Sequence, residues 1–154
     1  MNRSRQYLLI SPCRDEAQYL RRTLDSVGAQ SVPPALWVIV DDGSTDETPA
    51  ILEGYLRRLP YLRVVRRTDR GRRQVGPGVI EAFYAGLEKV RLEDFDYLCK
   101  LDMDLDLPVS YFELLMQRME SEPRVVPPPA SRGLFTRSTV NLFRRSVVTR
   151  CQRA

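Results

Sequence analysis

The stretch LWVIVDDGSTDETP, which runs from Leu36 to Pro49, decides the fold class. Five apolar residues of strand length lead directly into two adjacent carboxylates, Asp41 and Asp42, then into Gly43 and a series of short polar residues. Open parallel sheets bind ligands beyond the carboxyl ends of their strands, so this acidic pair is expected at a functional edge. A carboxylate there can accept a hydrogen bond from a nucleobase or ribose hydroxyl, or hold a cation. The alternative is a helix-capping turn, because Asp, Gly, Ser and Thr all favour turns and N-caps.

The rest of the chain alternates between two periodicities. Apolar runs of strand length lie at residues 7–11, 36–40, 62–65 and 97–101, and apolar residues at helical spacing lie at 17–27, 52–59 and 80–90. A fourth helix, at roughly 110–120, is predicted from a capping-box spacing. The strand-length runs are apolar on both faces, which is typical of a buried parallel sheet. This order predicts an α/β fold: a Rossmann-like β-α-β layer with a mainly parallel sheet and helices on both faces.

Two pairs of residues have the spacing of a capping box. Ser44 precedes Glu47 by three residues, and Ser110 precedes Glu113 by three. In a capping box, the serine and glutamate side chains satisfy exposed amides of a helix's first turn. The spacing predicts that helices begin at Ser44 and at Ser110.

A second acidic cluster follows the fourth expected strand. In the run KLDMDLDLP, residues 100–108, one residue separates each of Asp102, Asp104 and Asp106. Such repeats are common in solvated turns, but this one follows a strand, as the first acidic pair does. Hard divalent cations such as Mg²⁺ and Mn²⁺ are often held by one or two carboxylates together with substrate phosphates. The two clusters together predict a metal-dependent site for a diphosphate ligand.

Composition points to one soluble globular unit. The chain has 154 residues, of which 43% are hydrophobic. No apolar run reaches the length of a membrane span, and the apolar stretch near the N-terminus is too short for a signal peptide. Three widely spaced cysteines favour neither a disulfide framework nor a zinc site. We expect a cytoplasmic protein, located at the cytoplasmic face of a membrane if a longer parent protein carries membrane helices.

The net charge of +4 is unevenly distributed. All 20 acidic residues lie at or before Glu122, where they outnumber 17 basic residues, whereas residues 123–154 contain seven arginines and no acid. The second segment also contains three consecutive prolines and little periodicity. We therefore divide the chain into an α/β unit, residues 1–122, and a basic, proline- and arginine-rich tail, residues 123–154, which is expected to be disordered or aberrant.

A succession of motifs in the first 122 residues resembles glycosyltransferase family 2, whose members have the GT-A fold. The motifs are Pro12-x-x-Asp15-Glu16, Leu24-x-Ser26-x-x-x-Gln30, Val40-Asp-Asp-Gly-Ser-x-Asp-x-Thr48, a glycine-containing helix at 76–86, and Lys100-Leu-Asp-x-Asp104. Their order and spacing match along residues 6–120. The resemblance implies a nucleotide-diphosphate-sugar donor, favouring the UDP type, and a divalent metal, Mn²⁺ or Mg²⁺. It also implies an inverting displacement in which a hydroxyl of an unknown acceptor attacks the anomeric carbon.

The resemblance also assigns roles to individual positions. The first loop and the Asp-Asp-Gly-Ser turn hold the nucleoside in this family, and the matching positions are Pro12, Arg14, Glu16, Asp41, Asp42 and Gly43. Asp42 is implied to accept from a uracil-type imide. Asp102 would face the ribose or the metal, Asp104 would ligate the metal, and Asp106 has no assigned role. Arginines between residues 66 and 73 are either phosphate contacts or a solvated surface run.

The sequence departs from the family pattern after the metal motif. Family members continue there with an acceptor-binding region and a carboxylate that acts as general base, whereas this chain has no Asp or Glu after Glu122. The tail is either a genuine basic segment or an out-of-frame translation of a GC-rich gene, which the 22 arginines against two lysines favour. No catalytic residue is assigned, and we expect this truncated donor half to bind the donor without transferring the sugar.

Two other classes of function remain open. A receiver-like regulatory domain also collects aspartates at strand ends, but it needs an Asp after the third strand and a Lys after the fifth; here the third run ends in Val65-Arg66, and no fifth strand is expected. The arginine-rich tail suggests a nucleic-acid or polyanion-binding module. Because the tail has little aromatic interleaving and the body is acidic, no nucleic-acid partner is expected.

Overall fold

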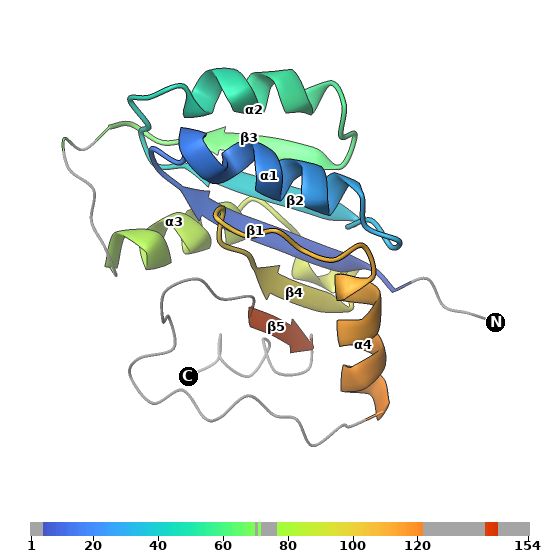
Figure 1. The fold of residues 1–154 in the computed structure, drawn as a ribbon. Coiled ribbons are helices and arrows are strands. Elements are labelled where there is room, and N and C mark those ends of the chain that lie inside the picture. The colour runs from blue at the N-terminus through green and yellow to red at the C-terminus, as the bar shows by residue number, and fades with distance from the viewer. Residues whose placement is uncertain (1–4, 70, 72–76, 122–140, 145–154) are drawn as a thin grey trace.

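A computed structural model describes residues 5–69, 71, 77–121 and, for the backbone only, 141–144 (Figure 1). The strands are β1 (Tyr7–Cys13), β2 (Leu36–Asp41), β3 (Leu62–Arg66), β4 (Tyr97–Lys100) and β5 (Asn141–Arg144); the helices are α1 (Ala17–Gly28), α2 (Thr48–Leu56), α3 (Pro77–Leu87) and α4 (Tyr111–Ser121), with a short 3-10 helix, η1 (Leu92–Asp94). The four predicted strands and four predicted helices are all present, so the α/β prediction is confirmed. Within this part of the chain, none of the helices has the length and apolarity that crossing a membrane requires.

The sheet has the strand order β3-β2-β1-β4-β5. β1 pairs in parallel with both β2 and β4, and β2 pairs in parallel with β3. The chain thus winds outward from β1 to β3 and then crosses to the other side of β1 to form β4 (Figure 1). Open α/β sheets bind ligands where the direction of winding reverses, so the topology marks the carboxyl ends of β1 and β4 as the candidate site.

β5 extends the sheet beyond β4 and is antiparallel to it, with Lys100 opposite Asn141 and Tyr97 opposite Arg144. The expectation that no fifth strand exists is therefore wrong. The four residues lack a longer apolar run of their own and instead complete the edge of a sheet formed by the other half of the chain. Because the other residues after Ser121 lie outside the described part of the chain, the division at Glu122 and the disorder of the tail stay predictions.

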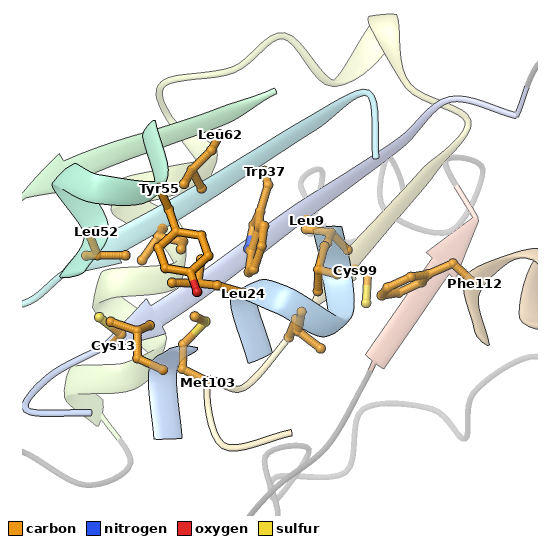
Figure 2. Packing of buried hydrophobic residues seen from close by; sticks show 14 of the residues in the cluster. Leu9, Cys13, Leu24, Trp37, Leu52, Tyr55, Leu62, Cys99, Met103 and Phe112 are labelled. Carbon is orange, nitrogen blue, oxygen red and sulfur yellow. The ribbon is translucent and has the colours of Figure 1, made fainter. Parts of the chain in front are cut away.

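Alternate residues of the central strands supply two separate cores. Leu9 faces the cluster formed with α1, α2 and α4, whereas Ile10 faces the cluster formed with α3. Trp37 of β2 is fully buried in the first cluster (Figure 2), and its indole N–H donates to Ser11 Oγ at 2.9 Å. The prediction of helices on both faces of the sheet is thus confirmed, and the polar atom of the largest core residue has a partner.

The start of α2 differs from the capping-box prediction. The helix begins at Thr48, with Glu47 at the N-cap position and a proline in the first turn. Ser44 Oγ instead accepts a hydrogen bond from the N–H of Asp15 at 2.9 Å. The prediction for Ser44 is therefore wrong, because a residue 29 positions earlier in the sequence occupies its oxygen. At Ser110 the predicted helix start is confirmed, since α4 begins at the next residue. The capping contacts of Ser110 and Glu113 stay predictions, and Glu113 Oε2 accepts from Ser31 Oγ at 2.7 Å.

α3 approaches the sheet closely through Gly86. A Cβ atom at this position would lie 2.8 Å from Val40 Cγ2 and 3.0 Å from Ile10 Cγ2. Both neighbours are buried β-branched residues, which have little rotamer freedom to give way. Gly86 therefore sets the distance between α3 and the sheet. Gly54 in α2 is different, because a Cβ atom there would have nothing within 4 Å.

We expect Gly86→Ala to lower the free energy of unfolding by about 1–3 kcal/mol, because overpacking against the two strands outweighs the gain in helix propensity. Gly54→Ala is the matched control, and it should raise the free energy of unfolding by roughly 0.5–1 kcal/mol. Urea unfolding of the three proteins measures both changes. Stabilisation by both substitutions would show that α3 does not pack at this distance.

Candidate functional site

The loops after β1, β2 and β4 meet at one edge of the sheet. Cys13, the last residue of β1, pairs with Asp41, the last residue of β2, and the ladder between β1 and β4 ends where Ile10 pairs with Lys100. Pro12 lies beyond that last pair, so its missing N–H removes no hydrogen bond from the β4 ladder. Parallel pairing therefore brings both acidic clusters to the carboxyl edge of β1.

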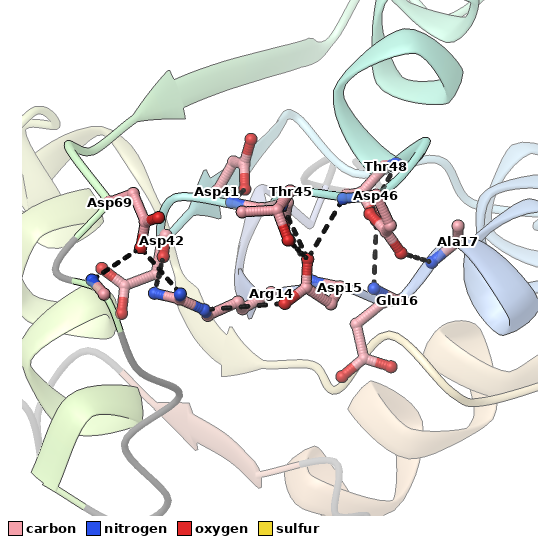
Figure 3. A network of polar contacts seen from close by, with 12 residues as sticks. Arg14, Asp15, Glu16, Ala17, Asp41, Asp42, Thr45, Asp46, Thr48 and Asp69 are labelled. Atoms are coloured by element: carbon pink, nitrogen blue, oxygen red, sulfur yellow. Dashed lines mark hydrogen bonds and ion pairs between the residues drawn. The ribbon is translucent and has the colours of Figure 1, made fainter.

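Asp15 ties the first loop to the second. Its φ of 52° lies in the left-handed region, which Asp tolerates better than most residues. Asp15 Oδ1 accepts hydrogen bonds from the backbone N–H of Thr45 at 2.8 Å and of Asp46 at 3.3 Å, and the N–H of Asp15 donates to Ser44 (Figure 3). No role was expected for Asp15 from the sequence. In the structure it fixes the first loop against the loop that follows β2.

Asp46 joins the starts of two helices. Its Oδ2 accepts from the N–H of Ala17, the first residue of α1, at 3.1 Å, and its Oδ1 accepts from the N–H of Thr48, the first residue of α2, at 2.8 Å. Glu16 donates its own N–H to Thr48 Oγ1 at 3.0 Å, and its carboxylate points away from this network (Figure 3). Burial acts to raise the pKa of Asp46, but the hydrogen bonds from Thr48 and Ala17 lower it overall.

The two adjacent carboxylates after β2 have different surroundings. Asp41 is 3% exposed, and its Oδ1 accepts from the N–H of Ser44 at 2.9 Å, within its own turn. Asp42 is partly exposed, and its Oδ1 lies 3.0 Å from Arg67 Nη1. Asp41 therefore shapes the turn, as the capping-turn alternative predicts, whereas Asp42 faces the cation of Arg67 at the edge of the sheet.

Two arginines from different loops surround Asp42. Arg14 donates from Nη1 to the Asp42 carbonyl oxygen at 2.9 Å and from Nη2 to Asp69 Oδ1 at 2.7 Å. Hydrogen bonds from the N–H of Gly71 and from Arg14 lower the pKa of Asp69. Among the described residues, Arg14 Nε and Arg67 Nη1 are buried without a hydrogen bond. Arg14 Nε lies 3.7 Å from Asp15 Oδ2, and Arg67 Nη1 forms the ion pair with Asp42. Arg67 therefore faces the Asp42 carboxylate, whereas Arg14 holds the Asp42 backbone.

Gly43 admits the backbone of the loop after β3. Its φ is +76°, and a Cβ atom there would lie 2.5 Å from the Cα atom of Asp69. Any other residue would be strained by this φ and would displace the Asp69 backbone. The backbone conformation and the close packing thus require a glycine at position 43, whether or not a ligand binds nearby. The arginines at 70, 72 and 73, which are candidate phosphate contacts, lie outside the described residues.

In the predicted metal motif, side chains alternate between the core and the surface. Leu101 and Met103 are buried, Asp102 is partly exposed and Asp104 is exposed. Lys100 is only 3% exposed and forms an ion pair with Asp102. A buried ammonium requires an anionic partner, and Asp102 supplies it. The lysine therefore holds the first carboxylate of the motif from the core side.

The carboxylates at this edge fit a cation that substrate phosphates also ligate better than a cation that protein side chains alone enclose. In the part of the chain that the structure describes, no group of three or more His, Cys, Asp or Glu side chains is arranged to hold a metal ion. Asp102 and Asp104 nevertheless offer two carboxylates from one turn. Mg²⁺ is commonly bound by one or two carboxylates plus substrate phosphates and water. These residues thus fit a cation that a diphosphate helps to ligate.

The structure places every predicted site residue at this edge, on strand ends or on the loops that follow them: Pro12, Arg14, Glu16, Asp41, Asp42, Gly43, Asp102 and Asp104. Their contacts with a ligand stay predictions. Three residues of the edge had no expected role: Asp15, Asp69 and Lys100. Arg67 was expected only as a member of a run that contacts phosphate or is solvated surface, and its pairing with Asp42 was not expected. Lys100 gives a sequence signal, because a lysine at the end of an otherwise apolar strand needs a partner.

A family model described as Glycosyl transferase family 2 matches residues 8–140. The chain belongs to this family. Among solved structures, residues 1–349 of S. aureus TarS are 21% identical with a TM-score of 0.69, over 96% of this chain and 49% of that one. The mannosyltransferase PcManGT from Pyrobaculum calidifontis, in complex with GDP-Man and Mn²⁺, is 23% identical with a TM-score of 0.57, over 70% of this chain and 30% of that one. These likenesses show the GT-A fold.

The proteins that match this family 2 chain by sequence alone align with a smaller part of it than the solved structures do. The Mycobacterium tuberculosis protein Rv1520, whose function is uncharacterised, is 36% identical over 66 residues, which are 41% of this chain and 19% of that protein. The chain therefore spans about half the length of TarS 1–349 and matches a smaller share of the mycobacterial protein.

Asp46→Asn should lower the free energy of unfolding by about 1 kcal/mol at neutral pH, because the amide keeps only one acceptor oxygen for two helix N–H groups. The folded-state pKa of Asp46 is lowered, so the wild-type advantage is complete above about pH 5 and is lost as the pH falls through that pKa. Urea titrations across this pH range measure the difference. Asp94→Asn, at an exposed position, is the control. A stability difference between the wild type and Asp46→Asn that does not change with pH would contradict the role of the Asp46 carboxylate in joining the two helix starts.

Proposed function

We propose that this chain is the donor-binding half of an inverting glycosyltransferase. It binds a nucleotide-diphosphate sugar, favouring the UDP type, together with Mn²⁺ or Mg²⁺, for transfer to an acceptor hydroxyl. The observation that carries the proposal is that Asp42 and the Asp102–Asp104 motif follow the two strands on either side of β1, at the carboxyl edge of a family 2 sheet whose winding reverses between β1 and β4. A cytoplasmic location fits such a donor.

The nucleoside is proposed to bind beside the Asp-Asp-Gly turn. The Asp42 carboxylate accepts from the imide N–H of uracil, and the guanidinium of Arg67, which pairs with Asp42, donates to a neighbouring carbonyl group. Arg14 holds the backbone of Asp42 beside the base. An acceptor next to donors matches an imide, in which an N–H lies between two C=O groups. TarS 1–349 has been solved in complex with UDP and with UDP-GlcNAc, which supports a uridine donor for a chain of this fold.

The remaining first-loop and turn residues have lesser parts in this proposal. Pro12 and Glu16 flank Arg14 at the end of β1 and border the nucleoside. Gly43 keeps the turn narrow enough for the third loop to reach it. Asp41 is the weaker of the two predicted carboxylate contacts, because its side chain is buried within the turn.

Asp102 and Asp104 are proposed to hold the metal, with Asp102 also facing the ribose. A bound divalent cation would neutralise charge on the diphosphate as it leaves the sugar. Lys100 keeps Asp102 in place from below, and the exposed carboxylate of Asp104 supplies a second oxygen ligand. Mn²⁺ in the structures of PcManGT and of the M. tuberculosis glucosyl-3-phosphoglycerate synthase, 24% identical with a TM-score of 0.52, supports this part.

The acceptor side is proposed to lie outside this chain. An inverting transfer needs a base to deprotonate the attacking hydroxyl, and the sequence offers no Asp or Glu after Glu122. We assign no general base among the described residues. The chain is therefore proposed to bind the donor without turning it over.

Asp104→Asn should remove most of the Mn²⁺-dependent binding of UDP, because an amide oxygen is an uncharged and poorer ligand for a hard cation. Calorimetric titration of UDP with and without Mn²⁺ measures this. Asp106→Asn, at an exposed position without an assigned role, is the matched control and should bind as the wild type does. Equal Mn²⁺ dependence in Asp104→Asn and the wild type would make the metal assignment wrong, and metal-independent binding that falls steeply with salt would favour a polyanion site instead.

Asp42→Ala should weaken the binding of uridine nucleotides by roughly 1–3 kcal/mol, because the imide loses a charged acceptor, and should leave the fold intact. The adjacent Asp41→Ala gives the contrast: it should reduce the stability of the protein, because the N–H of Ser44 loses its partner. Calorimetry and thermal unfolding separate the two effects. If Asp42→Ala destabilised the protein while the folded fraction bound uridine nucleotides normally, Asp42 would be a turn residue only.

A further inference from the structure

Thr23, on the buried face of α1, bonds to the backbone of the metal motif. Its side chain is fully buried, and Oγ1 lies 2.9 Å from the Met103 carbonyl oxygen and 2.7 Å from the Leu105 carbonyl oxygen. The same Oγ1 accepts from the N–H of Leu105 at 3.0 Å. A hydroxyl has a single proton, so it donates to one of the two carbonyls at a time or shares the proton between them. Thr23 therefore directs its polar group at the loop that carries the predicted metal ligands.

These hydrogen bonds lie on both sides of Asp104. The carbonyl of Met103 belongs to the peptide group before Asp104, and the N–H of Leu105 belongs to the peptide group after it. Each peptide group is planar, so holding both restricts the two soft backbone dihedrals of Asp104 and the direction of its Cα–Cβ bond. Met103 is 2% exposed, and Leu105 packs against the same core cluster. The exposed Asp104 carboxylate thus stands on a backbone that is held from the core.

A second side chain holds the far end of the same loop. Gln30 follows Thr23 by seven residues, about two helical turns, and lies just past the end of α1. Its Nε2 donates to the Pro108 carbonyl oxygen at 2.8 Å, and its Oε1 accepts from the N–H of Phe112 at 3.3 Å. The loop between β4 and α4 is therefore held at two places, by Thr23 within α1 and by Gln30 just past its end, and Thr23 is the residue that holds it next to Asp104.

We infer that Thr23 is a positioning residue for metal binding: its hydroxyl presets the backbone of Asp104, so that the carboxylate reorganises little when it takes up a cation with a nucleotide diphosphate. The inference rests on the proposed function. Removing a group that orients a metal ligand commonly lowers metal affinity by roughly 10- to 100-fold. Contacts with the nucleobase come from the loops after β1 and β2 in this arrangement, so they do not depend on Thr23.

The test compares Thr23→Val, which keeps the shape of the side chain but not its hydroxyl, with Thr23→Ser, which keeps the hydroxyl. Binding of Mn²⁺ in the presence of UDP is measured from the electron paramagnetic resonance signal of free Mn²⁺, and metal-free uridine binding is measured by calorimetry. Thr23→Val should lower the affinity for Mn²⁺ by about tenfold or more and leave uridine binding unchanged. Thr23→Ser should restore most of the affinity for Mn²⁺.

Tyr7→Phe is the matched control. It also removes a buried hydroxyl bond, from Tyr7 Oη to the Val32 carbonyl oxygen at 2.6 Å, but at the opposite end of β1 from the site. It should lower the melting temperature and leave the affinity for Mn²⁺ unchanged. If Thr23→Val does not fold, Thr23→Cys takes its place, because a thiol is a weaker donor and acceptor than a hydroxyl.

Amide hydrogen exchange tests the anchoring without metal. Protection of the Leu105 amide should fall in Thr23→Val and return in Thr23→Ser. Unchanged protection of this amide in Thr23→Val, wild-type affinity for Mn²⁺ in that variant, or an equal loss of affinity in Tyr7→Phe would overturn the inference. Failure of the wild type to bind Mn²⁺ with UDP, despite a protected Leu105 amide, would instead overturn the proposed function and the metal role of Thr23 with it.

Discussion

The parallel pairing of β1 with both β2 and β4 is the constraint on which the site depends. Because the three strands run in one direction, the loops that follow them meet at one edge, and each loop brings carboxylates there. Gathered like charges repel unless cations lie between them. Arg14, Arg67 and Lys100 supply those cations, and each of their side chains is at least three-quarters buried. Their partner carboxylates, Asp69, Asp42 and Asp102 respectively, come from three different loops. The topology therefore determines where the acids lie and makes partner cations necessary.

α1 gives two of these loops a common frame. Its first residue, Ala17, donates to Asp46 in the loop after β2, and Thr23 in its middle bonds to the loop after β4. A helix has a fixed rise per residue, so contacts at different turns of α1 hold the two loops at a fixed spacing. Loops that carry function are otherwise the most mobile parts of such folds. Each of these bonds satisfies a backbone group that would be costly to leave unpaired in the interior.

The elements of the fold could be predicted because their signal is local. Hydrophobic periodicity predicted the four strands of the parallel sheet and three of the helices within a few residues, the capping-box spacing at Ser110 predicted the fourth helix, and the succession of motifs identified the acidic residues at the edge. The start of α2 could not be found in this way, because the contact that takes the oxygen of Ser44 comes from Asp15 in another loop. The pairing of Arg67 with Asp42 could not be found for a related reason. The sequence predicts for this basic run either phosphate contacts or solvated surface, and only the fold places one of its members beside Asp42.

The different surroundings of Asp41 and Asp42 explain how a buried strand can end in two negative charges. Successive side chains of a strand point to opposite sides, so the two carboxylates need not share one environment. The Asp41 side chain lies within its own turn and accepts a hydrogen bond from the N–H of Ser44. The hydroxyl oxygen of Ser44 accepts from the N–H of Asp15. The first loop fixed in this way carries Arg14, which donates to the carbonyl oxygen of Asp42. The structural carboxylate therefore fixes the position of the one that faces the site.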